Sequence, residues 1–187
     1  MRVISGEYGG RRLKAVKGKN TRPTTDKVKE SLFHMIGPYF NGGTALDLYS
    51  GSGSLGIEAV SRGMDRAYLV EKHPGAIKTI QENVAMTKEE DKFVVWRKTD
   101  QQALECFKIN SIVFDLVLLD PPYEKQDLGH VINDILSSKL VNTHALIVCE
   151  TEKDTVLDSS DNNLTLVKEK VYGLSKITVY EWRPEND

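Results

Sequence analysis

The chain has 187 residues, of which 40% are hydrophobic and 28% are charged, a composition typical of one folded globular domain. It has no apolar run long enough for a membrane helix and no apolar signal core near its start, and two cysteines are too few for a disulfide scaffold. The formal net charge is −2, and the four histidines lack the spacing of metal ligands, so we expect no metal site.

Positive charge is concentrated at the start of the chain. Residues 1–30 carry nine lysines and arginines against three acids, a local charge of +6, and the rest of the chain sums to −8. This asymmetry is typical of a basic arm that meets a polyanion, and a solvated terminus is the alternative. Charge alone makes nucleic acid a candidate partner.

Residues 1–40 are predicted to form a basic extension. Two short runs around Gly9 and Gly10 predict a β-hairpin over residues 3–16, and a polar linker follows over 17–22. Apolar residues at helical spacing then predict a helix over 24–36.

From residue 41 onwards, predicted strands alternate with predicted helices. The apolar runs predict strands over 44–49, 66–71, 93–96, 114–120 and 145–149. The helical patterns fall over 52–62, from 74 to about 84, over 103–107 and over 128–136. Two last strands, 164–173 and 175–182, are joined so tightly that they must be antiparallel. The sequence predicts an α/β three-layer sandwich, with a parallel sheet finished by an antiparallel hairpin, in a single domain over 1–187.

A glycine loop follows the first predicted strand of this sheet. Residues 51–56 read G-x-G-x-x-G, and Glu71 ends the next strand. The glycines let the backbone approach a ligand closely, and the acid can accept hydrogen bonds from ribose hydroxyls. The loop predicts a nucleoside cofactor without choosing between a nicotinamide dinucleotide and another nucleoside.

Asp47 favours one of these cofactors. It precedes the loop as D-L-Y-S-G-S-G, where a carboxylate would repel a pyrophosphate but attract an ammonium group. The methionine part of S-adenosylmethionine carries such a group, and the arrangement resembles the cofactor loop of class I methyltransferases. A turn-capping role for Asp47 is the alternative.

The tetrapeptide Asp120-Pro121-Pro122-Tyr123 ends the fourth predicted strand, so it should share a crevice with the glycine loop. A carboxylate and a carbonyl held by prolines can accept both N–H bonds of an amino group, and the tyrosine offers a face for a base. Simple termination of the strand is the alternative. D-P-P-Y resembles the motif of methyltransferases that modify amino nitrogens, which include DNA adenine-N6, RNA guanine-N2 and protein glutamine enzymes.

The start of the chain resembles one of these groups, the RsmD-type 16S ribosomal RNA guanine-N2 methyltransferases. The matching residues are Ile4, Gly6, Gly10, Arg11 and Leu13, then Arg22, Pro23, Thr24, Asp26, Glu30, Leu32 and Phe33. The Tyr172-Gly173 turn also matches. The resemblance implies a Rossmann-like methyltransferase sheet of seven strands. It also implies S-adenosylmethionine as donor, and methylation of N2 of the guanine at position 966 in 16S ribosomal RNA, within the small subunit or an assembly intermediate.

The resemblance also implies site residues. For catalysis these are Asp120, Pro121, Pro122 and Tyr123. For the cofactor they are Asp47, Tyr49, Gly51, Gly53, Glu71 and Asp100, the last holding the adenine amino group. For RNA we expect Arg11, Arg12, Arg22 and Thr24. We expect a cytoplasmic, monomeric enzyme that binds no metal.

Three other functions stay open at this point. A DNA adenine-N6 methyltransferase shares D-P-P-Y, but it usually needs a target-recognition region, and only residues 1–40 precede the sheet here. An oxidoreductase that uses a nicotinamide dinucleotide fits the glycine loop but explains neither Asp47 nor D-P-P-Y. A non-catalytic RNA-binding module would use the basic arm alone.

Overall fold

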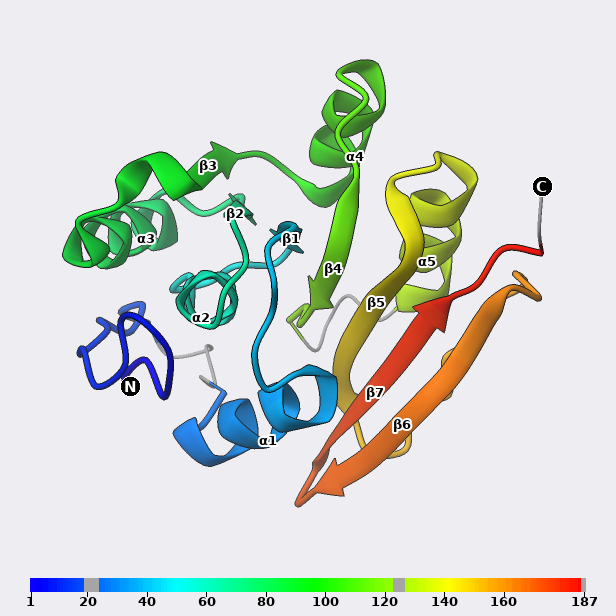
Figure 1. Ribbon diagram of the computed structural model, residues 1–187, viewed down its shortest axis with the longest axis horizontal. Helices are drawn as coiled ribbons and strands as arrows, with labels where there is room; N and C mark the ends of the chain where they lie inside the picture. Colours follow the sequence, from blue (N-terminus) through cyan, green and yellow to red (C-terminus); the bar gives the residue numbers. More distant parts are fainter. Residues whose placement is uncertain (19–23, 123–126, 186–187) are drawn as a thin grey trace.

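The fold is built on a mixed sheet, seen in a computed structural model that describes residues 1–18, 24–122 and 127–185 (Figure 1). Within these residues the sheet has seven strands in the order β3-β2-β1-β4-β5-β7-β6. They are β1 (Thr44–Asp47), β2 (Arg66–Glu71), β3 (Phe93–Arg97), β4 (Phe114–Leu119), β5 (Val141–Glu152), β6 (Leu164–Tyr172) and β7 (Ser175–Trp182).

The first helix precedes β1, and the others connect successive strands of the parallel part. The helices are α1 (Asp26–Ile36), α2 (Ser54–Ser61), α3 (Pro74–Thr87), α4 (Asp100–Ile109) and α5 (Leu128–Ser137), with a short 3₁₀ turn, η1 (Glu90–Lys92), before β3. None of the helices in the described ranges combines the length and the apolar character needed to cross a bilayer.

The strand order reverses at β1. This strand pairs in parallel with β2 on one side and with β4 on the other, so the chain leaves β1 in one direction and returns beside it from the other. In open α/β sheets, ligands bind at the carboxyl ends of the strands where the order reverses. The topology therefore directs attention to the residues that follow β1 and β4.

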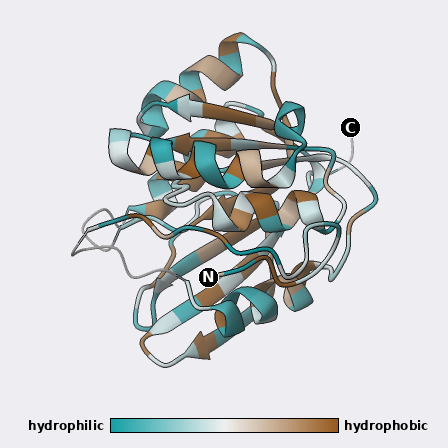
Figure 2. Ribbon diagram, turned by 90° about the vertical axis from the view of Figure 1, so that its left-hand side faces the viewer, coloured by the Kyte–Doolittle hydropathy of each residue, from teal (hydrophilic) through white to brown (hydrophobic). Residues whose placement is uncertain are grey.

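Helices cover both faces of the sheet. Side chains alternate between the faces along each strand, so Ala45 packs with the core beneath α1, α2 and α3, while Leu46 packs with the core beneath α4 and α5. Leu116 and Val117 of β4 divide in the same way. Figure 2 shows the largely hydrophobic strands between these helices. The predicted three-layer arrangement is confirmed.

The last two strands form the predicted antiparallel hairpin. β7 pairs antiparallel with both β5 and β6, and the turn between β6 and β7 passes through Gly173 at φ +58°. The hydroxyl of Tyr172, just before this turn, hydrogen bonds with Ser31 of α1. The hairpin thus forms one edge of the sheet and contacts helix α1.

The predicted hairpin over residues 3–16 is present in a short, irregular form, with backbone hydrogen bonds from Val3 N to Arg11 O, from Gly10 N to Val3 O and from Leu13 N to Met1 O. The strand pairing there is an isolated bridge between Arg2 and Arg12, with turns over residues 5–10. The backbone N–H groups of residues 4, 5, 7 and 8 donate to Glu58 and Ser61 of α2. Because α2 satisfies these donors, the short hairpin is docked on that helix, which keeps it from forming longer regular strands.

Element boundaries differ from the prediction where tertiary contacts decide them. β1 ends at Asp47 because the chain turns into the glycine loop, and α2 begins at Ser54 because Gly53 has φ +83°. β5 extends over residues 141–152 because it pairs with β4 on one side and β7 on the other.

A buried ion-pair network fastens the N-terminal segment to α2. Glu58 is fully buried and lies 2.9 Å from Arg62 Nε and 3.5 Å from Lys29 Nζ. Lys29 Nζ also donates to the carbonyl of Arg2 at 2.6 Å and to Ser54 Oγ at 2.9 Å. The network links α1, α2 and the first residues of the chain. Lys29 therefore does not contribute to a surface arm, although its charge was counted there.

Candidate active site

The carboxyl edge of the sheet carries an acid at or near the end of each of five neighbouring parallel strands. Asp47 ends β1, Glu71 ends β2, Asp100 begins α4 just after β3, Asp120 follows β4, and Glu150 lies in β5. Asp120 and Glu150 come directly after Leu119 and Cys149, which pair with each other in register. The topology thus gathers negative charge at the edge where ligands bind.

The glycine loop connects this edge to α2. Gly51 and Gly53 have φ +57° and +83°, a left-handed conformation that favours glycine. Gly56 lies in the first turn of α2, where a Cβ atom would come within 2.1 Å of Leu69 Cδ2. The glycines therefore permit both the turn and the close approach of α2 to the sheet.

Asp47 lies beneath this loop with 1% of its surface exposed. Its Oδ2 accepts hydrogen bonds from Gly56 N at 3.0 Å and from Ser50 Oγ at 3.1 Å. Its Oδ1 is buried and has no hydrogen-bond partner among the described residues. Burial, together with the negative charge of Glu71, raises the pKa of Asp47 to about 7. A positively charged hydrogen-bond donor on a ligand would stabilise this buried, unpartnered carboxylate oxygen.

Glu71 joins the glycine loop to the end of β2. Its Oε2 accepts from Gly51 N at 3.0 Å, and its Oε1 accepts from the backbone N–H groups of Lys72 and His73 at 2.8 and 3.0 Å. These bonds fix the carboxylate at the strand end. Each oxygen has a second lone pair, so the group can still accept from ligand hydroxyls.

Tyr49 and Asp100 form a further pair at this edge. The Tyr49 hydroxyl donates to Asp100 Oδ2 at 2.8 Å, and Gln101 N donates to Asp100 Oδ1 at 2.9 Å. Burial and the neighbouring carboxylate raise the pKa of Tyr49, so the hydroxyl keeps its proton and acts as the donor. The structure thus brings together two of the residues that were expected to bind the cofactor.

Asp120 lies beside a second carboxylate and a threonine. Thr24 Oγ1 is 3.2 Å from Asp120 Oδ2 and 3.0 Å from Glu150 Oε2. Burial is the largest cause that raises the pKa of Asp120 well above its usual range, and the negative charges of Glu150 and Asp47 add to it. Thr24, two residues before α1, therefore reaches into the carboxyl edge of the sheet.

The other predicted site residues have different outcomes. Pro121 and Pro122 follow Asp120 directly in the described chain. Tyr123 and Arg22 lie outside the described residues. Thr24 was expected near the mouth of the crevice, and the structure brings it to Asp120.

Two arginines predicted to contact RNA have separate surroundings. Arg11 Nη1 donates to the carbonyls of Met86 and Thr87 at 3.1 and 3.0 Å, at the C-terminal end of α3, and its guanidinium lies 5.3 Å from the centre of the Tyr8 ring. This position is favourable for a cation because the helix end is partly negative. Arg12 is exposed. Arg11 therefore has a structural position, and Arg12 is the better candidate for an external anion.

Sequence reasoning missed Glu150. Its signal was present, since the apolar run Ala145–Cys149 ends in an acid just as Phe114–Leu119 does. No recognised motif marks this acid, and only the pairing of β4 with β5 brings it beside Asp120.

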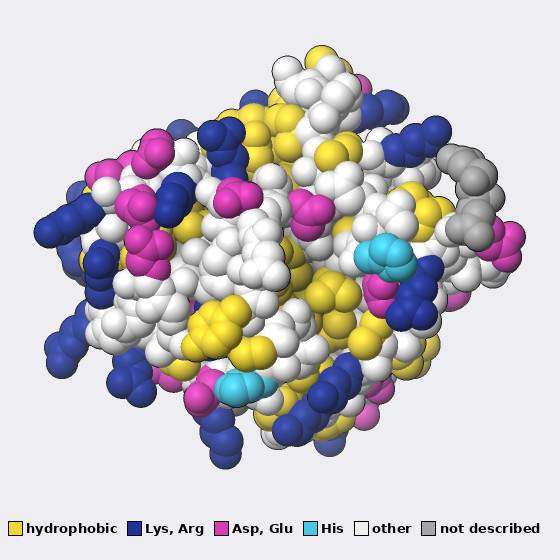
Figure 3. All heavy atoms as spheres, in the orientation of Figure 1, with side chains coloured by type: hydrophobic (Ala, Val, Ile, Leu, Met, Phe, Trp, Pro, Cys, Tyr) yellow, Lys and Arg dark blue, Asp and Glu magenta, His cyan; other side chains and the backbone are white. Residues whose placement is uncertain are grey.

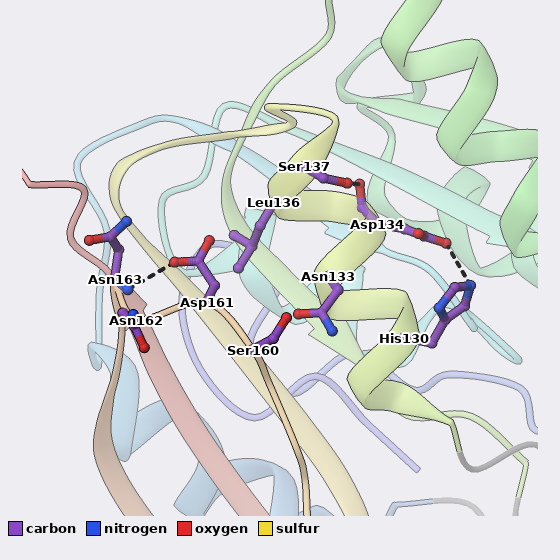
Figure 4. Close-up of a pocket in the computed structure, with 9 residues that line it drawn as sticks. All are labelled: His130, Asn133, Asp134, Leu136, Ser137, Ser160, Asp161, Asn162 and Asn163. Atoms are coloured by element: carbon purple, nitrogen blue, oxygen red, sulfur yellow. Dashed lines mark hydrogen bonds and ion pairs between the residues drawn. The ribbon is translucent and has the colours of Figure 1, made fainter.

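A polar groove of about 640 Å³ lies elsewhere, between α5 and the segment before β6 (Figure 4). Helix α5 contributes His130, Asn133 and Asp134, and the facing side is formed by residues 160–163. It contains none of the five acids of the carboxyl edge. In the described part of the chain, no group of three or more His, Cys, Asp or Glu side chains is arranged to hold a metal ion.

Comparison with known proteins identifies the family. The family model described as conserved hypothetical protein 95 matches residues 1–181. The chain belongs to this family. The match extends from the N-terminal segment to the end of β7, so it includes every predicted site residue.

Relatives in this family carry informative names. The Haemophilus influenzae protein named ribosomal RNA small subunit methyltransferase D is 34% identical over 185 residues, covering 97% of this chain and 93% of the relative. The Bacillus subtilis protein YlbH is 41% identical over 183 residues, covering 98% of this chain and all of the relative. The resemblance seen in the sequence is confirmed.

Solved structures of similar proteins have the same fold. The yhhF protein of Escherichia coli superposes with a TM-score of 0.83 at 29% identity, covering 99% of both chains. A conserved hypothetical protein of Streptococcus pyogenes superposes with a TM-score of 0.79 at 46% identity, covering 83% of this chain and 96% of that one. The predicted Rossmann-like methyltransferase sheet is confirmed.

Proposed function

We propose that the chain is an S-adenosylmethionine-dependent RNA methyltransferase that methylates the exocyclic N2 of a guanine in 16S ribosomal RNA. The observation that carries this proposal is the carboxyl edge of the sheet, where a buried carboxylate with an unpartnered oxygen, Asp47, lies close enough to Asp120 to raise its pKa. Asp47 suits the positively charged methyl donor, and Asp120 suits the amino group that receives the methyl group. The names of close relatives support an RNA of the small ribosomal subunit as substrate.

The cofactor side of the site fits S-adenosylmethionine. Asp47 would accept from the ammonium group, since its buried Oδ1 has no partner among the described residues. Glu71, fixed by Gly51 N, would accept from the ribose hydroxyls, and Asp100 would accept from the adenine amino group. When bound, S-adenosylmethionine supplies a methyl group on a positively charged sulfur.

The substrate side accepts an exocyclic amino group. The lone pair of such a nitrogen is delocalised into the ring, so the nitrogen becomes nucleophilic when both of its N–H bonds point at acceptors. Asp120 would offer its carboxylate, Pro121 its carbonyl oxygen, and Tyr123 a face on which the flipped base stacks. The raised pKa of Asp120 makes its carboxylate a stronger base than an exposed one, so it can take up the proton that leaves the nitrogen.

The substrate is an RNA, and we extend this to the guanine at position 966 of the small ribosomal subunit or of an assembly intermediate, methylated in the cytoplasm. We further propose that residues 1–187 act as one domain and as a monomer. Thr24, hydrogen bonded at Asp120, and Arg22 would lie at the mouth of the site.

A labelling assay tests the proposal. Isotopically labelled S-adenosylmethionine is offered with unmodified small subunits, the same RNA without protein, or adenine-rich duplex DNA, and the digested nucleosides are identified by mass spectrometry. We expect N2-methylguanosine from the subunit. N6-methyladenine from the DNA would favour a DNA enzyme instead, and no transfer to any acceptor would contradict the function.

A further inference from the structure

Two carboxylates face the same threonine at the proposed amino-group site. Thr24 Oγ1 lies 3.2 Å from Asp120 Oδ2 and 3.0 Å from Glu150 Oε2. A hydroxyl carries one hydrogen, so it donates to one of these two oxygens at a time. Each carboxylate oxygen has two lone pairs, so the two acids can accept hydrogen bonds from a ligand in addition to the one from the threonine.

The sheet itself holds the two acids together. Leu119 of β4 and Cys149 of β5 are paired in parallel register, and each acid is the next residue along its strand. Glu150 also pairs with Ile177 of β7, so the strand beneath it is fixed from both sides. Backbone pairing therefore holds the two carboxylates at a fixed spacing, so they can recognise two neighbouring hydrogen-bond donors on a ligand.

A third acid marks this place as a ligand site. Asp47 is buried, its Oδ1 has no partner among the described residues, and its charge contributes to the raised pKa of Asp120. Leaving a buried carboxylate oxygen unpaired is costly unless a ligand supplies the donor. Asp120 is thus close enough to both Asp47 and Glu150 for their charges to act on it, and it lies next to the oxygen that awaits a donor.

Guanine and adenine differ in the pattern of hydrogen-bond donors and acceptors that their edges present to two neighbouring acceptors. Guanine presents two adjacent donors, N1–H and the N2 amino group. Adenine presents its N6 amino group beside N1, which is an acceptor. A carboxylate at the second position would bond to the N1–H of guanine and repel the N1 lone pair of adenine.

We propose that Glu150 is a specificity-determining residue that accepts the N1–H of the target guanine, while Asp120 accepts from the N2 amino group. This inference rests on the proposed function, because it names the residue that selects guanine at that same site. It also explains how a chain with a D-P-P motif shared with adenine enzymes would reject adenine.

The test compares guanine with 2-aminopurine at the target position of the acceptor found in the labelling assay. Both bases carry the N2 amino group, but N1 of 2-aminopurine bears no hydrogen. We expect the wild-type protein to prefer guanine by about 10- to 100-fold in kcat/KM. In Glu150→Gln the amide can donate to N1, so the preference should fall by about tenfold or more.

Glu152→Gln is the matched control. Glu152 is on the same strand and exposed, and the substitution removes the same charge, so the preference should not change. Loss of O6 in 2-aminopurine affects all variants alike, and the change in preference therefore isolates N1.

The outcomes separate the inference from the function it rests on. A Glu150→Gln protein that methylates guanine with the wild-type preference would overturn the specificity role. If that variant fails to fold, Glu150→Asp retains the charge but withdraws it by one methylene, and it should lose activity on guanine without gaining any on 2-aminopurine. A gain on 2-aminopurine would also overturn the inference. Absence of N2-methylguanosine with the wild-type protein would contradict the function itself.

Discussion

Asp47 occupies a position where a carboxylate is costly in the free protein. It is 1% exposed, and burial raises its pKa to about 7. Because the folded protein holds this proton more tightly than the unfolded chain, where the pKa is about 4, the contribution of Asp47 to stability falls as the pH rises from about 4 to about 7. This cost is the kind that a functional site retains when a ligand offsets it.

The ionisation of Asp47 predicts a pH dependence of cofactor binding. A cationic ammonium group binds the ionised carboxylate, so the affinity for S-adenosylmethionine should weaken by up to about tenfold per pH unit below about 7. Isothermal titration calorimetry at several pH values from about 5.5 to about 7 checks this prediction. In Asp47→Asn the affinity should be lower at pH 7 and nearly constant across the range. An equally steep profile in the variant would assign the titration to another group.

Asp120 is predicted to act in transfer but not in cofactor binding. Asp120→Asn removes the acceptor for the amino group, so kcat should fall by about 10²- to 10³-fold. The dissociation constant for S-adenosylmethionine should stay close to that of the wild type. Glu105→Gln, the same chemical change at an exposed position on α4, serves as control. An active Asp120→Asn enzyme would refute the assignment.

At the scale of elements, local patterns predicted the strands and the carboxyl edge well. D-L-Y-S-G-S-G and D-P-P-Y each place an acid after an apolar run, and both acids lie where the topology requires. Glu150 ends a similar run but lacks a motif, so only strand pairing reveals it. The docking of the N-terminal hairpin on α2 could not be predicted, because several of its backbone donors bond to Glu58 and Ser61, which are more than fifty positions away in sequence.

Helix α1 shows a second limit of sequence patterns. Lys29 belongs by its type to the solvent-facing side of a helix, yet it is fully buried because Glu58 and Ser54 of α2 face it. Burial lowers the pKa of Lys29, while the carboxylate opposes this change. A buried lysine is tolerated only with such partners, and these partners come from another element.

This network predicts a large loss of stability in Glu58→Gln. The change leaves the buried Lys29 and Arg62 without their counter-charge, which costs about 3–5 kcal/mol of the free energy of unfolding. Urea denaturation followed by circular dichroism measures it. Glu82→Gln breaks an exposed ion pair with Lys14 and should change stability little. Equal effects of both substitutions would contradict the structural role of the network.

At the scale of the whole molecule, the basic extension is smaller than the sequence count indicates. Arg2 and Lys14 pair with Asp26 and Glu82, Arg11 contacts the end of α3, and Lys29 is buried. Figure 3 shows basic side chains along the margin around the N-terminal segment, with acids among them. Within the described residues, Arg12, Lys17 and Lys27 are the exposed cations of this region that have no hydrogen bond or ion pair in the structure.

The remaining exposed cations predict a specific salt dependence of RNA binding. Each lysine or arginine that contacts a phosphate contributes about 0.7–0.9 to the slope of log affinity against log salt concentration. The double change Arg12→Glu and Lys17→Glu should therefore weaken RNA binding and reduce this slope, while binding of S-adenosylmethionine, measured by calorimetry, stays the same.

The control is the double change Lys108→Glu and Lys139→Glu. It reverses as many exposed charges, but at residues that precede β4 and β5, at the opposite edge of the sheet from Asp120. If the control lowers the slope as much as the N-terminal change, net charge rather than the extension attracts the RNA. If neither change lowers it, the RNA contacts lie on another surface. A loss confined to the N-terminal variant would show that the RNA contacts the N-terminal extension.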